Sequence, residues 1–145
     1  MKNIKDYIEF ANKYPTAFLA TIDGDKPRVR GLWMWFADET GFYFHTGSNK
    51  NLYKQLKANP NVEASFCSNQ QQNNMMVRIS GKVEFVSDKM LMDRLMTERA
   101  FLLAPMKEAM GDKAEIVIFR INTGEAYYWD MKNNLDENNN GKVIF

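Results

Sequence analysis

The chain has 145 residues, 45% of them hydrophobic and 13% aromatic, which suffices for the core of one domain and excludes a disordered chain. The 19 basic and 18 acidic residues leave a net charge of +1, so the positive field that drives binding to nucleic-acid backbones is missing and no nucleic acid is expected as a partner. One cysteine and one histidine exclude an intramolecular disulfide and a Cys/His zinc site, and no metal is expected.

The first half of the chain predicts a helix, three strands and a second helix. Apolar residues at helical spacing predict a helix over residues 3–13, which Pro15 ends. Apolar segments separated by turn-forming residues then predict strands over 17–22, 28–36 and 42–46. A helix over 49–58 follows, and Asn59-Pro60 ends it.

The second half predicts four more strands and one helix. Gly81 interrupts the longest of these strands, which predicts a bulge or a bend at a barrel corner. Asn122-Thr123-Gly124 has the composition of a turn between the last two strands. The expected strands cover 62–67, 75–86, 114–121 and 125–130, and the helix covers 89–103.

Strands linked mostly by tight turns favour an antiparallel sheet over a parallel one, which needs a helix between most strands. We therefore expect a mainly β protein: an antiparallel barrel with peripheral helices, in one domain over residues 1–131 with a polar, Asn-rich tail over 132–145. The charged start and the lack of ~18 consecutive apolar residues predict no secretory signal, no membrane span and a cytoplasmic location.

Four polar residues have the composition of a phosphate site. Arg28 and Arg30 are two apart, so they share one face of their strand. Ser48 as the N-cap and Lys50 stand at the start of a helix, where free N–H groups attract anions. The alternative interpretation is that Ser48 only caps the helix and that the three cations are solvated.

The single histidine, His45, lies in an apolar strand without an identifiable acid partner. This favours a structural or cofactor-lining group over a general base. Cys67 ends an apolar strand and is expected to be a small buried residue. Trp33, Trp35 and Trp129 are core candidates, although Trp129 stands near the tail, where an aromatic ring can reach a partner or a flat ligand.

Six segments, taken in order, resemble the pyridoxamine 5'-phosphate oxidase-like flavin-binding split barrels. The resemblance covers about residues 5–130, and the last segment is similar to the general stress protein 26 and nitroimidazole-resistance branches. The ordered set is more specific than any one segment. These segments are Phe18–Thr21, Pro27–Phe36, Phe42–Lys50, Gln55–Val62, Val77–Glu84 and Ala126–Asp130.

The resemblance implies a six-stranded antiparallel split β-barrel that binds FMN at the interface of a homodimer. Ser48, Lys50 and Arg30 stand at the positions of the family's phosphate-binding serine, lysine and strand arginine, so they would hold the phosphate. His45 and Thr46 would line the flavin, and Trp129 would approach the flavin of the second subunit. The implied cofactor-binding residues are Arg30, His45, Thr46, Ser48, Lys50 and Trp129.

Three departures from the family pattern bear on the activity. Asn49 replaces an often basic residue, and Trp35 replaces a lysine that contacts the flavin. The Arg-x-His segment that reads pyridoxal phosphate has no counterpart, because residues 132–140 are rich in Asn and Asp. Oxidation of pyridoxamine phosphate is therefore not expected.

The resemblance favours an FMN-dependent oxidoreductase that reduces a small molecule such as a nitroaromatic or a quinone. Because the flavin supplies the redox chemistry, no acid–base pair has to be present, and no catalytic residue is assigned. Two alternatives stay open: a non-catalytic flavin-binding or stress-response module, and the same barrel holding deazaflavin or haem.

Overall fold

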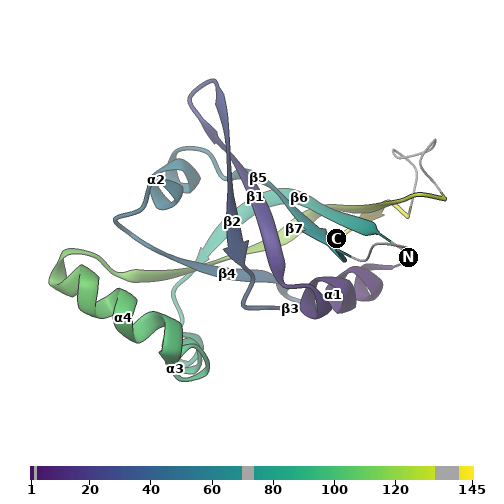
Figure 1. The fold of residues 1–145 in the computed structure, drawn as a ribbon. Coiled ribbons are helices and arrows are strands. Elements are labelled where there is room, and N and C mark those ends of the chain that lie inside the picture. Colours follow the sequence, from purple (N-terminus) through teal and green to yellow (C-terminus); the bar gives the residue numbers. More distant parts are fainter. Residues whose placement is uncertain (2, 70–73, 133–140) are drawn as a thin grey trace.

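The computed structural model describes residues 1, 3–69, 74–132 and 141–145. Within them, an antiparallel sheet forms the body of the molecule and four α-helices lie around it (Figure 1). None of these helices is long and apolar enough to cross a membrane. The elements are α1 (Ile4–Lys13), β1 (Thr16–Asp23), β2 (Lys26–Trp33), β3 (Phe36–Asp38), β4 (Gly41–Gly47), α2 (Asn51–Ala58), β5 (Asn61–Cys67), β6 (Met75–Val86), α3 (Lys89–Glu98), α4 (Ala100–Met110), a 3₁₀ turn (Gly111–Lys113), β7 (Ile116–Asp130) and β8 (Val143–Ile144).

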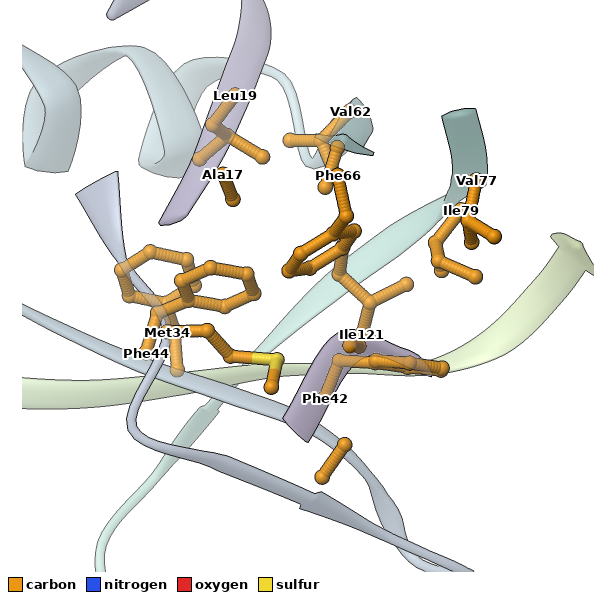
Figure 2. Packing of buried hydrophobic residues seen from close by; sticks show 14 of the residues in the cluster. Ala17, Leu19, Met34, Phe42, Phe44, Val62, Phe66, Val77, Ile79 and Ile121 are labelled. Atoms are coloured by element: carbon orange, nitrogen blue, oxygen red, sulfur yellow. The ribbon is translucent and has the colours of Figure 1, made fainter. Parts of the chain in front are cut away.

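The sheet curls around the larger of two hydrophobic clusters. Its strand order is β2-β1-β5-β6-β7-β4-β3, with β8 added beside β7. Side chains from five different strands pack into a single buried cluster (Figure 2), which a flat sheet does not allow. Leu19, Phe44, Phe66, Ile79 and Ile121 represent β1, β4, β5, β6 and β7 in it. The predicted class, an antiparallel split barrel with peripheral helices, is confirmed, with the short strands β3 and β8 beyond the six that the family resemblance implies.

The predicted turn at residues 122–124 is wrong, because β7 runs unbroken from Ile116 to Asp130. Lys82 pairs with Thr123 and Val83 pairs with Ile121, so Asn122 is one extra residue in the ladder with β6. Gly81 faces Gly124 beside this bulge, and a Cβ on Gly124 would lie 1.9 Å from the carbonyl oxygen of Ser80. Turn-forming residues therefore bend two long strands here, as the prediction for Gly81 expected.

Two other predicted elements are broken, and Arg99 lies at both breaks. The strand expected over 28–36 divides into β2 and β3, because the Met34 N–H bonds to Pro15 and the Trp35 N–H bonds to Tyr43. The helix expected over 89–103 divides into α3 and α4 at Arg99, whose φ of −118° and ψ of 27° leave the helical range. Its guanidinium bonds to main-chain carbonyls where β2 ends.

Part of the predicted tail joins the barrel. β8 pairs with β7 at Glu125 and Ala126, and the ring of Phe145 packs 5.7 Å from that of Phe42. The hydroxyl of Tyr7 on α1 donates to the carbonyl of Gly141, so the two ends of the chain lie side by side (Figure 1). The Asn-rich stretch over 133–140 lies outside the described residues.

Candidate functional site

A cleft of about 580 Å³ opens where β2 and β4 diverge. β4 pairs with β3 only from Gly41 to Tyr43, so beyond Tyr43 one edge of β4 has no strand partner in the described part of the chain. β2 pairs only with β1 there. Residues 30–33 of β2, 45–47 of β4 and 50–52 at the start of α2 line the cleft, together with Arg99, Leu102 and Met106.

Arg30 forms the polar end of the cleft. Its guanidinium donates to Thr21 Oγ1 at 2.7 Å, to Gln55 Oε1 at 2.6 Å and to the Leu19 carbonyl at 3.2 Å. Arg30 takes part in none of the ion pairs between described residues. Burial and the nearby Arg28 lower its pKa, which is the direction expected for a cation without an acid partner.

The start of α2 lies beside Arg30. Lys50 is the N-cap and makes no side-chain cap bond, so the first N–H groups of this helix lack a side-chain acceptor. Lys50 is exposed, and it too is in no ion pair within the described ranges. An uncapped helix start next to two cations has the charge and the free N–H groups that favour an anion.

The prediction that Ser48 caps this helix is wrong. The Ser48 N–H donates to the Glu115 carbonyl at 2.8 Å, and its Oγ accepts from the Glu115 N–H at 2.9 Å. These bonds connect the loop before α2 to the residue just before β7, and α2 begins only at Asn51. Because Oγ acts only as an acceptor in this bond, its O–H can still donate to another group.

A second hollow of about 820 Å³ lies on the other side of Arg30. Arg28 and Lys54 line it together with Arg30. Arg28 and Arg30 are two apart in the unbroken register of β2, so they share one face of the strand, as predicted. Arg28 pairs with Asp23 at 3.0 Å and is largely solvated. Of the two arginines, only Arg30 faces both hollows.

The other end of the cleft is apolar and aromatic. Trp33 stays 50% exposed and its ring lies 6.0 Å from that of Phe101, which is 66% exposed. Leu102 and Met106 of α4 continue this wall. Phe101 itself is not in the lining, so the surface suits a flat apolar molecule in contact with the Trp33 indole and the aliphatic side chains.

His45 and Arg99 meet between the two ends. Arg99 Nη1 lies 3.1 Å from His45 Nε2 and also donates to the Trp33 carbonyl at 2.9 Å, while Nη2 donates to the Met34 carbonyl at 2.6 Å. Burial first, and then the charge of Arg99, lower the pKa of His45 to about 4. The histidine is therefore neutral at pH 7.

The lining carries positive charge without compensation. Arg30, Lys50 and Arg99 contribute to it, and none of the described residues that line the cleft is Asp or Glu. Throughout the described ranges, no group of three or more His, Cys, Asp or Glu side chains is arranged to hold a metal. The cleft therefore suits an anionic ligand.

Four of the six predicted cofactor residues line this one cleft. They are Arg30, His45, Thr46 and Lys50. Ser48 lies next to the lining, in the loop tied to Glu115. Trp129 lies far along β7, opposite Met76, and is not in the lining.

The sequence analysis missed Thr21, Gln55 and Arg99. Thr21 and Gln55 hold the Arg30 guanidinium and are both buried. A polar residue in an apolar run is a signal for Thr21, and Gln55 on the apolar face of its helix is another. Nothing in the sequence separates Arg99 from an ordinary helix arginine.

A model of the family described as pyridoxamine 5'-phosphate oxidase matches residues 4–130. The chain belongs to this family. The matched residues include all those that line the cleft. No curated protein matches the chain.

Solved structures share the fold at low sequence identity. A NimC/NimA family protein from Clostridium acetobutylicum is 23% identical, with a TM-score of 0.71 over 97% of this chain and 91% of that one. A FAD-binding protein from Mesorhizobium loti is 17% identical, with a TM-score of 0.67 over 88% and 92%. General Stress Protein 26 from Bacillus anthracis is 17% identical, with a TM-score of 0.64 over 86% and 92%.

Proposed function

We propose that this protein is an FMN-binding homodimeric oxidoreductase that reduces a small electrophile such as a nitroaromatic or a quinone. One observation carries the proposal: the cleft has cations without an acid partner at one end and an apolar wall with the half-exposed indole of Trp33 at the other. FMN has the same two parts, a phosphate dianion and a flat ring system. The FAD-binding protein with the same fold supports a flavin.

The polar end fits a phosphate in charge and in geometry. Arg30 is held in place by Thr21 and Gln55, so a ligand does not have to order its side chain. Lys50 and the uncapped start of α2 add donors next to it. Ser48 can contribute its hydroxyl proton, as the family resemblance implies. Each charged hydrogen bond to phosphate contributes about 1.5–3 kcal/mol.

The other end fits the flavin ring. The free edge of β4 at His45–Gly47 offers main-chain groups to the polar rim of a ring, and Trp33 and Met106 offer apolar contact. A bound flavin would supply the electron transfer itself. The residues of this chain would bind the ring, orient it and exclude water from one side.

The charge of the cleft also bears on the substrate. An electrophile that gains negative charge on reduction is favoured beside Arg99 and the dipoles of the site. A second phosphate ester would need its own cation, and the Arg-x-His segment that reads pyridoxal phosphate is missing from the sequence. Pyridoxamine phosphate is therefore not the substrate we propose.

The outer face of β1 and β2 supports a dimer. Phe18 lies opposite Gly31 in the register, so Phe18, Val29 and Trp33 share one outward face, where they are 54%, 68% and 50% exposed. An apolar patch of this kind favours a second copy of the chain. Trp129 would then reach the partner's flavin. Sedimentation should give twice the chain mass at micromolar concentration, and a monomer that binds FMN tightly would reject the composite site.

The phosphate assignment is tested with FMN and riboflavin, which differ by the phosphate. Arg30→Ala and Lys50→Ala should each weaken FMN binding about tenfold or more and leave riboflavin binding nearly unchanged. Arg28→Ala is the matched control, because this exposed arginine already pairs with Asp23. Equal losses for the two flavins would overturn the assignment.

A non-catalytic flavin-binding module is the second candidate. The same cations and apolar wall would bind a flavin whether or not electrons then pass to a substrate. Turnover of NAD(P)H with a nitroaromatic or quinone separates the two candidates. The absorption spectrum separates flavin from deazaflavin or haem, and His45 Nε2 is already bonded to Arg99, which argues against its use as a haem ligand.

A further inference from the structure

Arg99 is 6% exposed, and its contact with His45 fixes which atom is the donor. A guanidinium has only N–H donors and stays protonated in proteins. At 3.1 Å from Arg99 Nη1, His45 Nε2 must therefore be the acceptor. A neutral imidazole with Nε2 as its acceptor carries its one proton on Nδ1.

His45 Nδ1 is the buried side-chain polar atom for which the described residues provide no partner. A buried N–H without an acceptor is unfavourable, and most such groups in proteins are paired. Other atoms of His45 line the cleft, whereas Nδ1 itself is buried. A ligand seated in the cleft can therefore supply the acceptor only if its binding displaces the side chains that cover Nδ1.

We propose that Arg99 is a positioning residue that holds His45 as a neutral imidazole with its proton on Nδ1, and that this N–H donates to an acceptor atom of the ring system bound in the cleft. The proposal about the donor rests on the proposed flavin function, whereas the proposal about the tautomer concerns the protein alone. The acceptor belongs to a carbonyl or an unprotonated ring nitrogen, since both occur on the rim of an oxidised flavin.

The surroundings of His45 disfavour its protonated form on every side. Arg99 approaches from the α3–α4 junction, and Arg30 of β2 and Lys50 before α2 line the same cleft. The acid next to Arg99, Glu98, is bonded to Arg94 and to the indole of Trp35.

On the strand of His45 itself, Tyr43 is bonded to Arg120 from β7, and Arg120 is bonded to Glu84 from β6. The lowered pKa of His45 is consistent with this arrangement. A group held neutral can keep the same donor over a broad pH range.

The experiment uses ¹⁵N-labelled histidine, and the full-length chain gives one imidazole because His45 is its only histidine. Two-bond nitrogen–proton correlation spectra distinguish the tautomers. Without added flavin at pH 7, the Nδ1–H form should exceed the Nε2–H form by about tenfold or more, as a charge-assisted hydrogen bond requires. An Nε2–H form, an equal mixture or a protonated ring would overturn the proposal.

Arg99→Met removes the donor and should bring the Nε2–H form to a comparable or greater population. Arg94→Met is the matched control, because Arg94 pairs with Glu98 and does not line the cleft; it should leave the tautomer unchanged. A folded Arg99→Met protein with an unchanged tautomer would remove Arg99 from the proposal.

Arg99→Lys covers the case in which Arg99→Met does not fold. An ammonium group also has only donors, so the Nδ1–H form should remain in excess. A folded Arg99→Lys protein with mostly Nε2–H histidine would overturn the mechanism.

FMN and riboflavin then test the donor, with flavin fluorescence as an independent measure of binding. Both should shift the Nδ1 resonance and its proton without changing the tautomer. If a flavin binds and Nδ1–H does not respond, the donor role is rejected. If neither flavin binds, the proposed function and the flavin as acceptor fall together, while the tautomer result for Arg99 stands.

Discussion

Two arginines without an acid partner line the cleft, Arg30 at its polar end and Arg99 beside His45, and the two residues are used differently. Arg30 is partly exposed and is held by Thr21, Gln55 and one carbonyl. Arg99 is buried and spends its hydrogen bonds on the carbonyls of Trp33 and Met34 and on His45. A missing acid partner therefore does not by itself identify a ligand site. The partners and the exposure decide whether the charge serves the ligand or the fold.

The largest effect should come from exchanging the two arginines for methionine. Arg99→Met leaves the buried Met34 carbonyl and the part-buried Trp33 carbonyl without their charged donor. This substitution should lower the free energy of unfolding by about 3–5 kcal/mol. Arg30→Met removes the guanidinium donor of Thr21, Gln55 and the Leu19 carbonyl, but Thr21 and Gln55 stay bonded to each other and the site is partly exposed. This substitution should therefore cost less, about 1–2 kcal/mol. Urea denaturation of both variants measures the difference. Equal losses would mean that Arg30 also serves the fold.

The pH dependence of stability tests the environment of His45 between the two ends. Its pKa is about 4 in the folded protein and 6.5 in the unfolded chain, so the unfolded state binds the proton more readily. The contribution of neutral His45 to the free energy of unfolding is complete above pH 6.5 and is lost as pH falls to about 4. The loss over this pH range is about 3 kcal/mol.

His45→Gln is the control for this titration, because an amide does not titrate and its oxygen can still accept from Arg99. The carboxylates of the protein titrate in both proteins and cancel in the difference. The wild-type protein should therefore lose more stability than His45→Gln between pH 6.5 and pH 4. Parallel curves would show that His45 is not held neutral.

The salt dependence of flavin binding should distinguish the two ends by their solvent exposure. A tenfold rise in ionic strength shortens the screening length about threefold. FMN binding should then weaken severalfold, about 1 kcal/mol, because Arg30 and Lys50 act through solvent-exposed charge. Riboflavin uses only the apolar end and should bind equally well. Fluorescence titrations at two salt concentrations measure both flavins.

Much of this site could be predicted because its parts are close together in the sequence. His45, Thr46 and Lys50 stand in one strand-loop-helix segment, and Arg30 lies on the preceding hairpin. Arg99 lies 54 residues after His45, and its role depends on the packing of α3 and α4 against β2 and β4. Helical spacing does not encode that contact.

Turn-forming residues were ambiguous in a different way. Asn122-Thr123-Gly124 fits a turn or a bulge equally well by composition. The partner strand decides between them, because β6 runs alongside without a break and Gly81 gives Gly124 room to approach. Pairing between distant strands is a tertiary property, and one segment alone does not contain it.

The smallest expected effect concerns Ser48, at the edge of the polar end. Its Oγ accepts from the Glu115 N–H at 2.9 Å, a neutral bond at the surface. Ser48→Ala should therefore lower the free energy of unfolding by about 1 kcal/mol. Its hydroxyl proton can also reach a phosphate, but an uncharged donor contributes less than the ammonium of Lys50.

FMN binding should accordingly weaken less in Ser48→Ala than in Lys50→Ala, and riboflavin binding should not change. Urea denaturation and flavin fluorescence, measured on the same preparations, separate the two roles of the hydroxyl. A loss of FMN affinity as large as that of Lys50→Ala, with stability unchanged, would mean that Ser48 acts mainly on the phosphate. The bond to Glu115 would then be incidental, and the polar end would depend on three side chains of comparable weight.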